Sequence, residues 1–204
     1  MELSERKKLE TELRALCAAK AYRRAAELAL SGYGPEIRKL MKVTFKDDYR
    51  VDDAFGAFSE AMLTSLPGFR WESSFRTWVY SVAHNVCLSL IRSGQTRERP
   101  LAEGGLDDRP VLDRTQTQPW LRTEVKSRFR ALQERLSAHE QQILALRLDR
   151  RLPWPEVARA MADHELSPEE LEKRATVLRQ QFQRIKTRLR ALAIDEELLQ
   201  DSTH

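Results

Sequence analysis

The chain has 204 residues, of which 41% are hydrophobic and 32% are charged, and its formal net charge is +4. This composition predicts a soluble protein with one domain or two small ones. No apolar run approaches the ~18 residues that a membrane span needs. The first ten residues also lack the apolar core of a secretory signal. We therefore expect a cytoplasmic protein with no membrane partner.

Residues that could carry chemistry are few and scattered. Cys17 and Cys87 lie far apart in apolar surroundings, which favours two small core residues over a disulfide or a metal pair. The segment that starts at His139 reads HEQQI, so Ile143 stands where a zinc-binding HExxH motif needs its second histidine. Glycine-rich phosphate loops and nucleophile motifs are missing. The sequence predicts neither an enzyme nor a bound cofactor or metal.

Helical patterns dominate the first 66 residues. Residues 4–30 are rich in strong helix formers and predict one helix. The glycines and the proline of residues 31–35 are expected to end it. A second helix is predicted over residues 36–45 and a third over residues 51–66, with Asp52 and Asp53 in the first turn of the third. Gly56 costs a helix roughly 1 kcal/mol relative to alanine, so we expect close packing around it.

The stretch from Phe69 to Arg92 combines an aromatic loop with a helical pattern. Phe69, Trp71 and Phe75 stand beside arginines and two serines. A wide apolar stripe follows, from which we assign four residues to the core: Trp78, Val82, Val86 and Ile91. Aromatic rings and cations suit single-stranded nucleic acid, because bases stack on rings and cations follow phosphates. Taken alone, the segment is also compatible with a buried helix and its entry loop.

Residues 94–119 interrupt the periodicity with glycines, prolines and charges of both signs. An irregular segment of this length is typical of a linker. It predicts an all-α fold of two small helical domains joined by a flexible linker.

The second half contains clear helix signals. A helix is predicted over residues 121–136, and Ser137 and Glu140 form a capping box that begins a short helix. Another short helix is expected over residues 156–161. Ser167-Pro168 then begins a long helix, in which apolar residues recur from Leu171 to Leu192 at alternating spacings of four and three.

This long helix carries six cations and no acid between Arg174 and Arg190. Arginine and glutamine are the side chains that read guanine and adenine edges in the major groove. The helix also follows a short one, as in helix-turn-helix proteins. A solvated helix surface would explain the charges too, although such surfaces normally mix both signs.

Together the two halves resemble a bacterial sigma factor of the extracytoplasmic-function (ECF) type, within the sigma-70 family. The resemblance covers roughly residues 31–193 and is strongest over FRWESSFRTWVYSVAHNVCLSLIR, which is similar to region 2 of the family. Its Phe75-Arg76-Thr77-Trp78 run, the Asn85 position and the closing Arg92 follow the family pattern. LQERLSAHEQQILALRLDRRLPWPEVARAMA resembles the first helices of region 4.

The resemblance implies partners and contact residues. The partners would be core RNA polymerase, promoter DNA (a melted −10 element and a duplex −35 element), and an anti-sigma factor. The −10 contacts would be Trp71, Ser73, Ser74, Phe75, Arg76, His84, Asn85 and Arg92. The −35 contacts would be Arg179, Gln180, Gln183, Arg184, Lys186 and Arg188. The polymerase contacts would be Asp52, Asp53, Phe55 and Glu60.

The same resemblance implies a division of the chain. The expected parts are an N-terminal extension (1–30), a region 2-like domain (31–93), the linker (94–119), a region 4-like helix-turn-helix domain (120–195) and a tail (196–204). Gly56 and Ala57 depart from the Gln-Glu pair that many relatives carry in the polymerase-binding helix. Residues 162–174 replace the usual short turn, so we expect the recognition helix to extend backwards.

Two other functions remain open on the sequence. One is a stand-alone helix-turn-helix transcriptional regulator, which would not need the aromatic loop. The other is a helical protein-interaction module whose basic helix is only a solvated surface.

Overall fold

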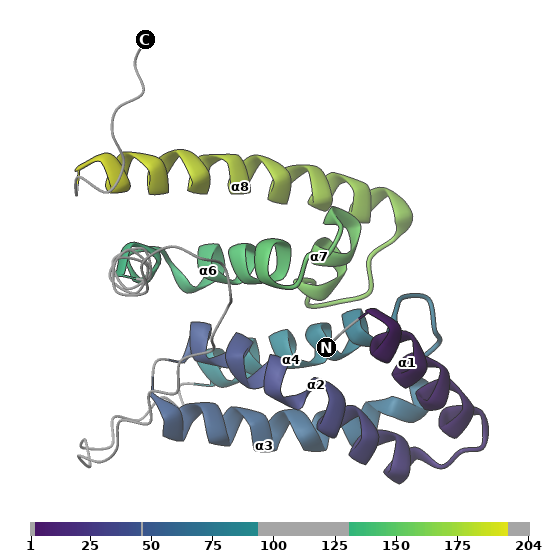
Figure 1. The fold of residues 1–204 in the computed structure, drawn as a ribbon. Coiled ribbons are helices and arrows are strands. Elements are labelled where there is room, and N and C mark those ends of the chain that lie inside the picture. Colours follow the sequence, from purple (N-terminus) through teal and green to yellow (C-terminus); the bar gives the residue numbers. More distant parts are fainter. Residues whose placement is uncertain (1–2, 46, 94–130, 196–204) are drawn as a thin grey trace.

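The computed structural model describes residues 3–45, 47–93 and 131–195, and the regular structure of these residues is entirely helical. This confirms the expected all-α class. The helices form stacked layers, with α8 (Pro168–Asp195) on one side and α3 (Asp48–Ser65) on the other (Figure 1). Between them lie a layer of α6 (Ala138–Leu144) and α7 (Trp154–Ala160) and a layer of α1 (Leu3–Ala18), α2 (Tyr22–Thr44) and α4 (Phe75–Arg92). None of the described helices is both long and apolar enough to span a membrane.

The first two helices differ from the prediction of one helix over residues 4–30. Helix α1 (Leu3–Ala18) ends at a short turn, and α2 (Tyr22–Thr44) begins after it. In the turn, Lys20 has a positive φ of 55°. The amide of Ala21 donates to the Leu16 carbonyl (2.9 Å) and that of Lys20 to the Cys17 carbonyl (3.0 Å). This is a Schellman motif, which usually has glycine where Lys20 stands. Because the sequence has no glycine here, it gave no signal that a helix ends at this position.

Helix α2 continues through residues 31–35, so the predicted end of a helix there is wrong. Pro35 lies inside α2, and the two glycines serve packing. A Cβ atom at Gly32 would lie 2.5 Å from Leu9 Cδ2 of α1, and one at Gly34 would lie 3.3 Å from Phe55 Cζ of α3. The missing side chains let both neighbouring helices approach α2 closely.

Helix α3 (Asp48–Ser65) begins three residues before its predicted start. The Asp47 side chain caps it by accepting a hydrogen bond from the Tyr49 amide (3.1 Å). A Cβ atom at Gly56 would meet nothing within 4 Å, so close packing does not explain this glycine, against expectation. The 3-10 turn η1 (Leu66–Gly68) follows, and after the aromatic loop α4 (Phe75–Arg92) completes the first half.

The second half contains α6 (Ala138–Leu144), the π-helical turn η2 (Ala145–Asp149), α7 (Trp154–Ala160) and α8 (Pro168–Asp195). The capping box of Ser137 and Glu140 is present as predicted. Most of the helix predicted over residues 121–136, the linker 94–119 and the tail 196–204 lie outside the described residues.

Helix α8 confirms the predicted long helix. The buried residues recur at the expected spacing: Ala175, Leu178, Phe182, Ile185 and Leu189. The Phe182 ring meets the Trp154 ring of α7 edge-on at 5.3 Å. The helix begins at Pro168, so it extends backwards from the cationic segment as the sequence suggested.

The two halves pack against each other. Helix α4 lies against α7, and α2 lies against α6. Gln142 Nε2 donates to Thr44 Oγ1 across this boundary (2.7 Å). The buried apolar side chains of both halves form one continuous cluster. Helix α2 also runs without a break across the division expected between residues 30 and 31.

Candidate nucleic-acid interface

Four aromatic rings gather where the loop of residues 69–74 meets α4. Phe69 lies 4.9 Å from Trp71 and 4.8 Å from Trp78, and Phe75 lies 5.8 Å from Trp71 and 5.2 Å from Trp78, between ring centroids. Phe75 is fully buried, whereas Phe69, Trp71 and Trp78 are half-buried. Phe75 therefore packs the loop onto the helices, and the other three rings keep part of their surface accessible.

Trp71 adopts an unusual backbone conformation. Its φ is +61°, in the left-handed region that costs an ordinary residue roughly 1 kcal/mol. The two phenylalanine rings pack beside its indole, and the guanidinium of Arg14 from α1 lies 5.2 Å from the ring. These contacts hold the indole between the two phenylalanine rings and the Arg14 side chain of α1.

The start of α4 is capped from two directions. The Ser74 side chain accepts a hydrogen bond from the Thr77 amide (3.1 Å). The carboxylate of Glu10, from α1, accepts hydrogen bonds from the amides of Phe75 and Arg76, each at 3.0 Å. Tyr33 also donates to Glu10 (3.0 Å), and burial, followed by the Glu10 charge, raises the pKa of this tyrosine. Helix α1 thus holds the first turn of α4 in place.

Arg76 is buried in a network that joins the halves. Its guanidinium lies 3.0 Å from the Glu36 carboxylate and donates to the carbonyl of Arg150 (3.1 Å). Tyr80 also donates to Glu36 (2.6 Å). Burial opposes the charge of Glu36, but the Tyr80 hydrogen bond and the Arg76 charge outweigh it and keep the pKa of Glu36 below its ordinary value. Arg76 is therefore a structural cation in this conformation.

His84 is also buried, on the face of α4 that meets the second half. Burial lowers the pKa of His84 from 6.5 to about 4, against a hydrogen bond with Gln142 of α6 that favours the charged form. The imidazole is consequently neutral near neutral pH.

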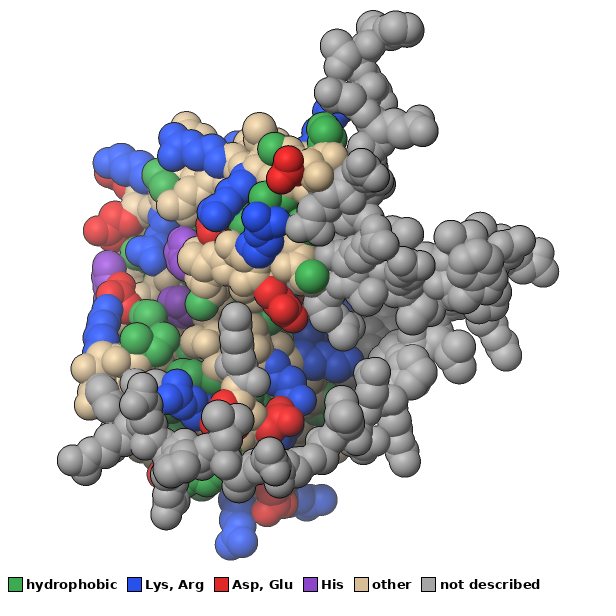
Figure 2. Space-filling view, turned by 90° about the vertical axis from the view of Figure 1, so that its left-hand side faces the viewer, with side chains coloured by type: hydrophobic (Ala, Val, Ile, Leu, Met, Phe, Trp, Pro, Cys, Tyr) green, Lys and Arg blue, Asp and Glu red, His purple; other side chains and the backbone are tan. Residues whose placement is uncertain are grey.

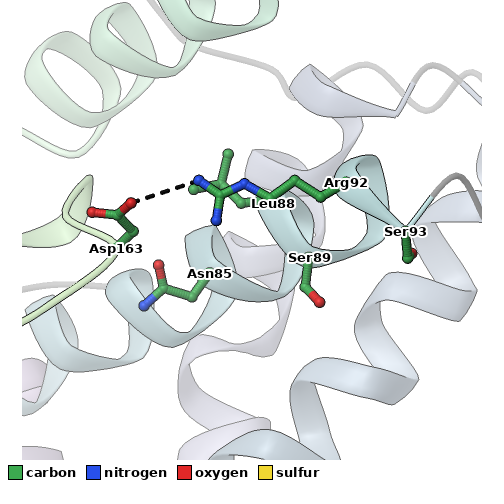
Figure 3. A pocket seen from close by; sticks show the side chains of 6 residues that line it. All are labelled: Asn85, Leu88, Ser89, Arg92, Ser93 and Asp163. Carbon is green, nitrogen blue, oxygen red and sulfur yellow. Dashed lines mark ion pairs between the residues drawn. The ribbon is translucent and has the colours of Figure 1, made fainter.

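The far end of α4 borders a hollow of about 470 Å³ (Figure 3). Asn85, Ser89 and Arg92 line it from α4. Asp163 lines it from the connection between α7 and α8, and its carboxylate lies 3.6 Å from the Arg92 guanidinium. The Arg92 side chain reaches across toward Asp163, and the Asn85 amide lies beside this gap.

A second hollow, of about 350 Å³, lies beside the aromatic loop. One wall consists of loop and α4 residues, among them Phe69, Ser73 and Trp78. The opposite wall comes from residues 159–166 of the second half, including Arg159, His164 and Glu165. Trp71 and Phe75 do not line it. A planar group that stacks on the Trp78 ring here would lie between this ring and residues 159–166 of the second half.

A comparison with protein families decides the identity of this region. Residues 30–97 match the family model described as Sigma-70 region 2. The chain contains a sigma-70 region 2 domain. The match covers most of α2, all of α3, the aromatic loop and α4, and its last four residues lie outside the described part. No curated protein matches the chain.

The match to region 2 supports the interpretation that the chain is a sigma-70 family sigma factor that acts in transcription initiation. Sigma factors are not enzymes, and this family binds core RNA polymerase and melted −10 DNA. Within the described ranges, no group of three or more His, Cys, Asp or Glu side chains is placed to hold a metal ion.

The eight predicted −10 residues differ in how exposed their side chains are. Ser74, Asn85 and Arg92 are exposed, Trp71 and Ser73 are half-buried, and Phe75, Arg76 and His84 are buried. DNA contacts by these residues stay predictions. For Arg76 and His84 they also require the second half to move.

The predicted apolar stripe of α4 is buried only in part. Trp78, Val82 and Val86 are half-buried and pack against the core, whereas Ile91 is exposed, so assigning Ile91 to the core was wrong. The buried apolar residues of α4 are Phe75, Val79, Tyr80, Ala83 and Cys87. The polar neighbours Arg76, Thr77 and His84 are covered as well, because the second half packs on their side of the helix.

On α3, the predicted polymerase contacts Asp52, Asp53 and Glu60 are exposed and Phe55 is half-buried. Arg38 of α2 pairs with Asp52 and lies 4.3 Å from the Phe55 ring. This arrangement leaves Asp53 and Glu60 accessible to a partner.

Outside region 2, all six predicted −35 residues of α8 are exposed: Arg179, Gln180, Gln183, Arg184, Lys186 and Arg188. Lys and Arg side chains are visible on the upper part of the molecule, at the level of α8 (Figure 2). Arg188 lies 3.5 Å from the Glu140 carboxylate. The α8 surface is therefore cationic and open on its outer side.

Four polar residues that organise the interface were missed: Glu10, Glu36, Arg150 and Glu156. Glu10 and Glu36 fall within the helices predicted over residues 4–30 and 36–45, and the sequence assigned no role to them or to Arg150. Glu156, whose carboxylate accepts a hydrogen bond from Thr77, was placed only as the start of a short helix. Their partners lie 40 to 114 residues away along the chain, so no local pattern could reveal them.

Proposed function

We propose that this chain is a sigma factor of the ECF type, which directs core RNA polymerase to specific promoters and opens their −10 element. The observation that carries the proposal is the region 2 match over residues 30–97. It is supported by a second helical half that ends in a long helix with an exposed cationic face. RNA synthesis itself would be the chemistry of the polymerase.

In this function, the aromatic loop and the outer face of α4 hold the melted strand. Unstacking a base costs a few kcal/mol, which ring stacking and pocket contacts must offset. Trp71 of the loop and Trp78 of α4 are both half-buried, so each keeps part of its ring accessible. Asn85 can donate and accept hydrogen bonds at a base edge, and Arg92 supplies a phosphate contact near the end of α4.

The proposed contacts with core polymerase and with the −35 element lie on other helices, α3 and α8. Asp53 and Glu60 of α3 are exposed acids that suit a partner surface on core polymerase. On α8, Arg184 and Gln183 belong to the exposed cationic face and suit the major groove of the duplex −35 element. The three proposed contact regions are therefore carried by separate helices, as simultaneous binding of polymerase and two promoter elements requires.

Run-off transcription tests the proposal. Core polymerase is supplied with a library of genomic promoter fragments, with and without the chain, and the transcripts are sequenced. We expect a set of transcripts with defined starts that appear only when the chain is present. If the chain adds no promoter-dependent transcript and does not co-purify with core polymerase, the sigma function is refuted.

A further inference from the structure

The connection between α7 and α8 (residues 161–167) lies against the proposed −10 surface of region 2. Its acids face arginines of that surface. Asp163 is 3.6 Å from the Arg92 guanidinium, and Glu165 is 3.8 Å from the Arg70 guanidinium. Asp163 also lies 2.9 Å from His164 Nδ1, and Arg70 lies 4.0 Å from Glu72. Two carboxylates thus lie beside a cation of the aromatic loop and a cation at the end of α4.

The same connection forms part of the border of both hollows of the surface. Asp163 lines the hollow at Asn85 and Arg92, where Figure 3 shows the Arg92 side chain extended toward it. His164 and Glu165 form part of the wall opposite Phe69 and Trp78. A strand that enters either hollow to reach Trp78 or Asn85 would therefore lie beside the acids of this connection.

Buried contacts hold the connection in place. Glu156 of α7 accepts a hydrogen bond from Thr77, and Arg76 donates to the Arg150 carbonyl (3.1 Å). The ion pairs of the connection are themselves exposed, with side-chain exposures of 69% and 45% for Arg92 and Asp163, and 72% and 66% for Arg70 and Glu165. Exposed pairs contribute little stability, so removing them should ease opening without unfolding either half.

We propose that residues 161–167 form an intramolecular latch, in which Asp163 and Glu165 occupy the phosphate positions of the −10 surface and exclude single-stranded DNA from the free chain. The inference rests on the proposed function and accounts for the segment that separates α7 from α8. A strand binds the fraction of molecules in which the latch is open, so its apparent affinity is reduced by that fraction.

The test uses the full chain and a double variant, Asp163→Asn with Glu165→Gln, which keeps the shape of both side chains and removes their charge. The matched control is Glu169→Gln with Glu172→Gln. It removes the same charge from exposed positions in the first turns of α8. Binding of a fluorescent single-stranded oligonucleotide is measured by anisotropy, and thermal unfolding followed by circular dichroism checks that each variant is folded.

We expect the double variant to bind the oligonucleotide about five-fold more tightly than the wild type, as two exposed ion pairs of ordinary strength allow. The control variant should stay close to the wild type. The single variants Asp163→Asn and Glu165→Gln should each give part of the gain. The latch is refuted if the double variant gains no more than the control, because the change would then reflect net charge alone.

Failure of the latch and failure of the sigma function give different results. If the wild type supports promoter-dependent transcription but the double variant binds the strand no better than the control, only the latch is wrong. If the double variant gains affinity for the strand but no form of the chain supports transcription with core polymerase, the latch stands and the sigma function fails.

Discussion

Gly32 and Gly56 both lie inside helices but in different surroundings. A side chain at Gly32 would displace Leu9 of α1, whereas one at Gly56 would point into open space. The sequence suggested that Gly32 ended a helix and that Gly56 packed closely, and both interpretations were wrong. Local composition identifies a glycine as unusual, but only the neighbouring helices decide what it does.

Replacing these glycines should therefore have unequal effects. Gly56→Ala should raise the free energy of unfolding by about 1 kcal/mol, because alanine is the better helix former and meets no obstacle. In Gly32→Ala the same gain is offset by the displacement of Leu9. Urea unfolding of the two variants measures the difference. An equal or larger gain for Gly32→Ala would contradict the packing described for α1 and α2.

His84 should make the stability of the protein depend on pH. Its pKa is about 4 in the folded protein and 6.5 in the unfolded reference, so the unfolded chain binds the proton more tightly. The stabilisation by neutral His84 is fully present above pH 6.5 and is lost as the pH falls toward 4. The full loss corresponds to about 3 kcal/mol.

The measurement is the urea unfolding free energy as a function of pH for the wild type and His84→Gln. Glutamine does not titrate, so its curve should lack the part of the acid-side fall that His84 causes. Identical slopes for the two proteins between pH 6.5 and 4 would show that the imidazole is not held neutral by burial.

Among the elements, α8 was predicted well and α2 was not. The start of α8 is set by Ser167, Pro168 and Glu170 within four residues of chain, and its stripe repeats over its whole length. The course of α2 depends on close contacts with α1 and α3, which composition does not encode. The aromatic loop was located correctly, because its rings lie next to one another in sequence. The burial of Arg76 and His84 was missed because it depends on the second half.

Helix α1 has a specific task, since Glu10 caps α4 from a distance of 65 residues along the chain. Glu10→Gln should lower the free energy of unfolding by about 1 kcal/mol, because the charged acceptor at the helix N-terminus is lost. Glu12→Gln is the matched control on the exposed side of the same helix. Chemical unfolding measures the free energy of unfolding of both variants. An equally small change in both would show that Glu10 does not stabilise the start of α4.

The exposed face of α8 should bind duplex DNA mainly through phosphate charge. Arg184→Ala should weaken binding to promoter duplex and lower the slope of log affinity against log salt by about one. Lys173→Ala, exposed in an earlier turn of α8, is the comparison. Titrations at several salt concentrations give the slope, and an unchanged slope for Arg184→Ala would exclude this residue from the phosphate contacts.

At the scale of the whole molecule, the two halves share one apolar cluster and a buried network around Arg76 and Glu36. The sequence predicted two helical halves but left their arrangement open, because contacts between α4 and α7 depend on surfaces far apart in the chain. Opening the −10 element would require these halves to separate and expose the aromatic loop and α4.

Transcription from duplex and pre-melted promoter templates, with core polymerase and either wild-type chain or Trp71→Ala, tests this account most directly. Glu72→Ala, in the same loop, serves as the control. We predict that Trp71→Ala loses far more transcript on duplex templates than on templates already melted over the −10 element, while the control resembles the wild type. Equal loss on both templates would contradict a role for the loop in opening the promoter.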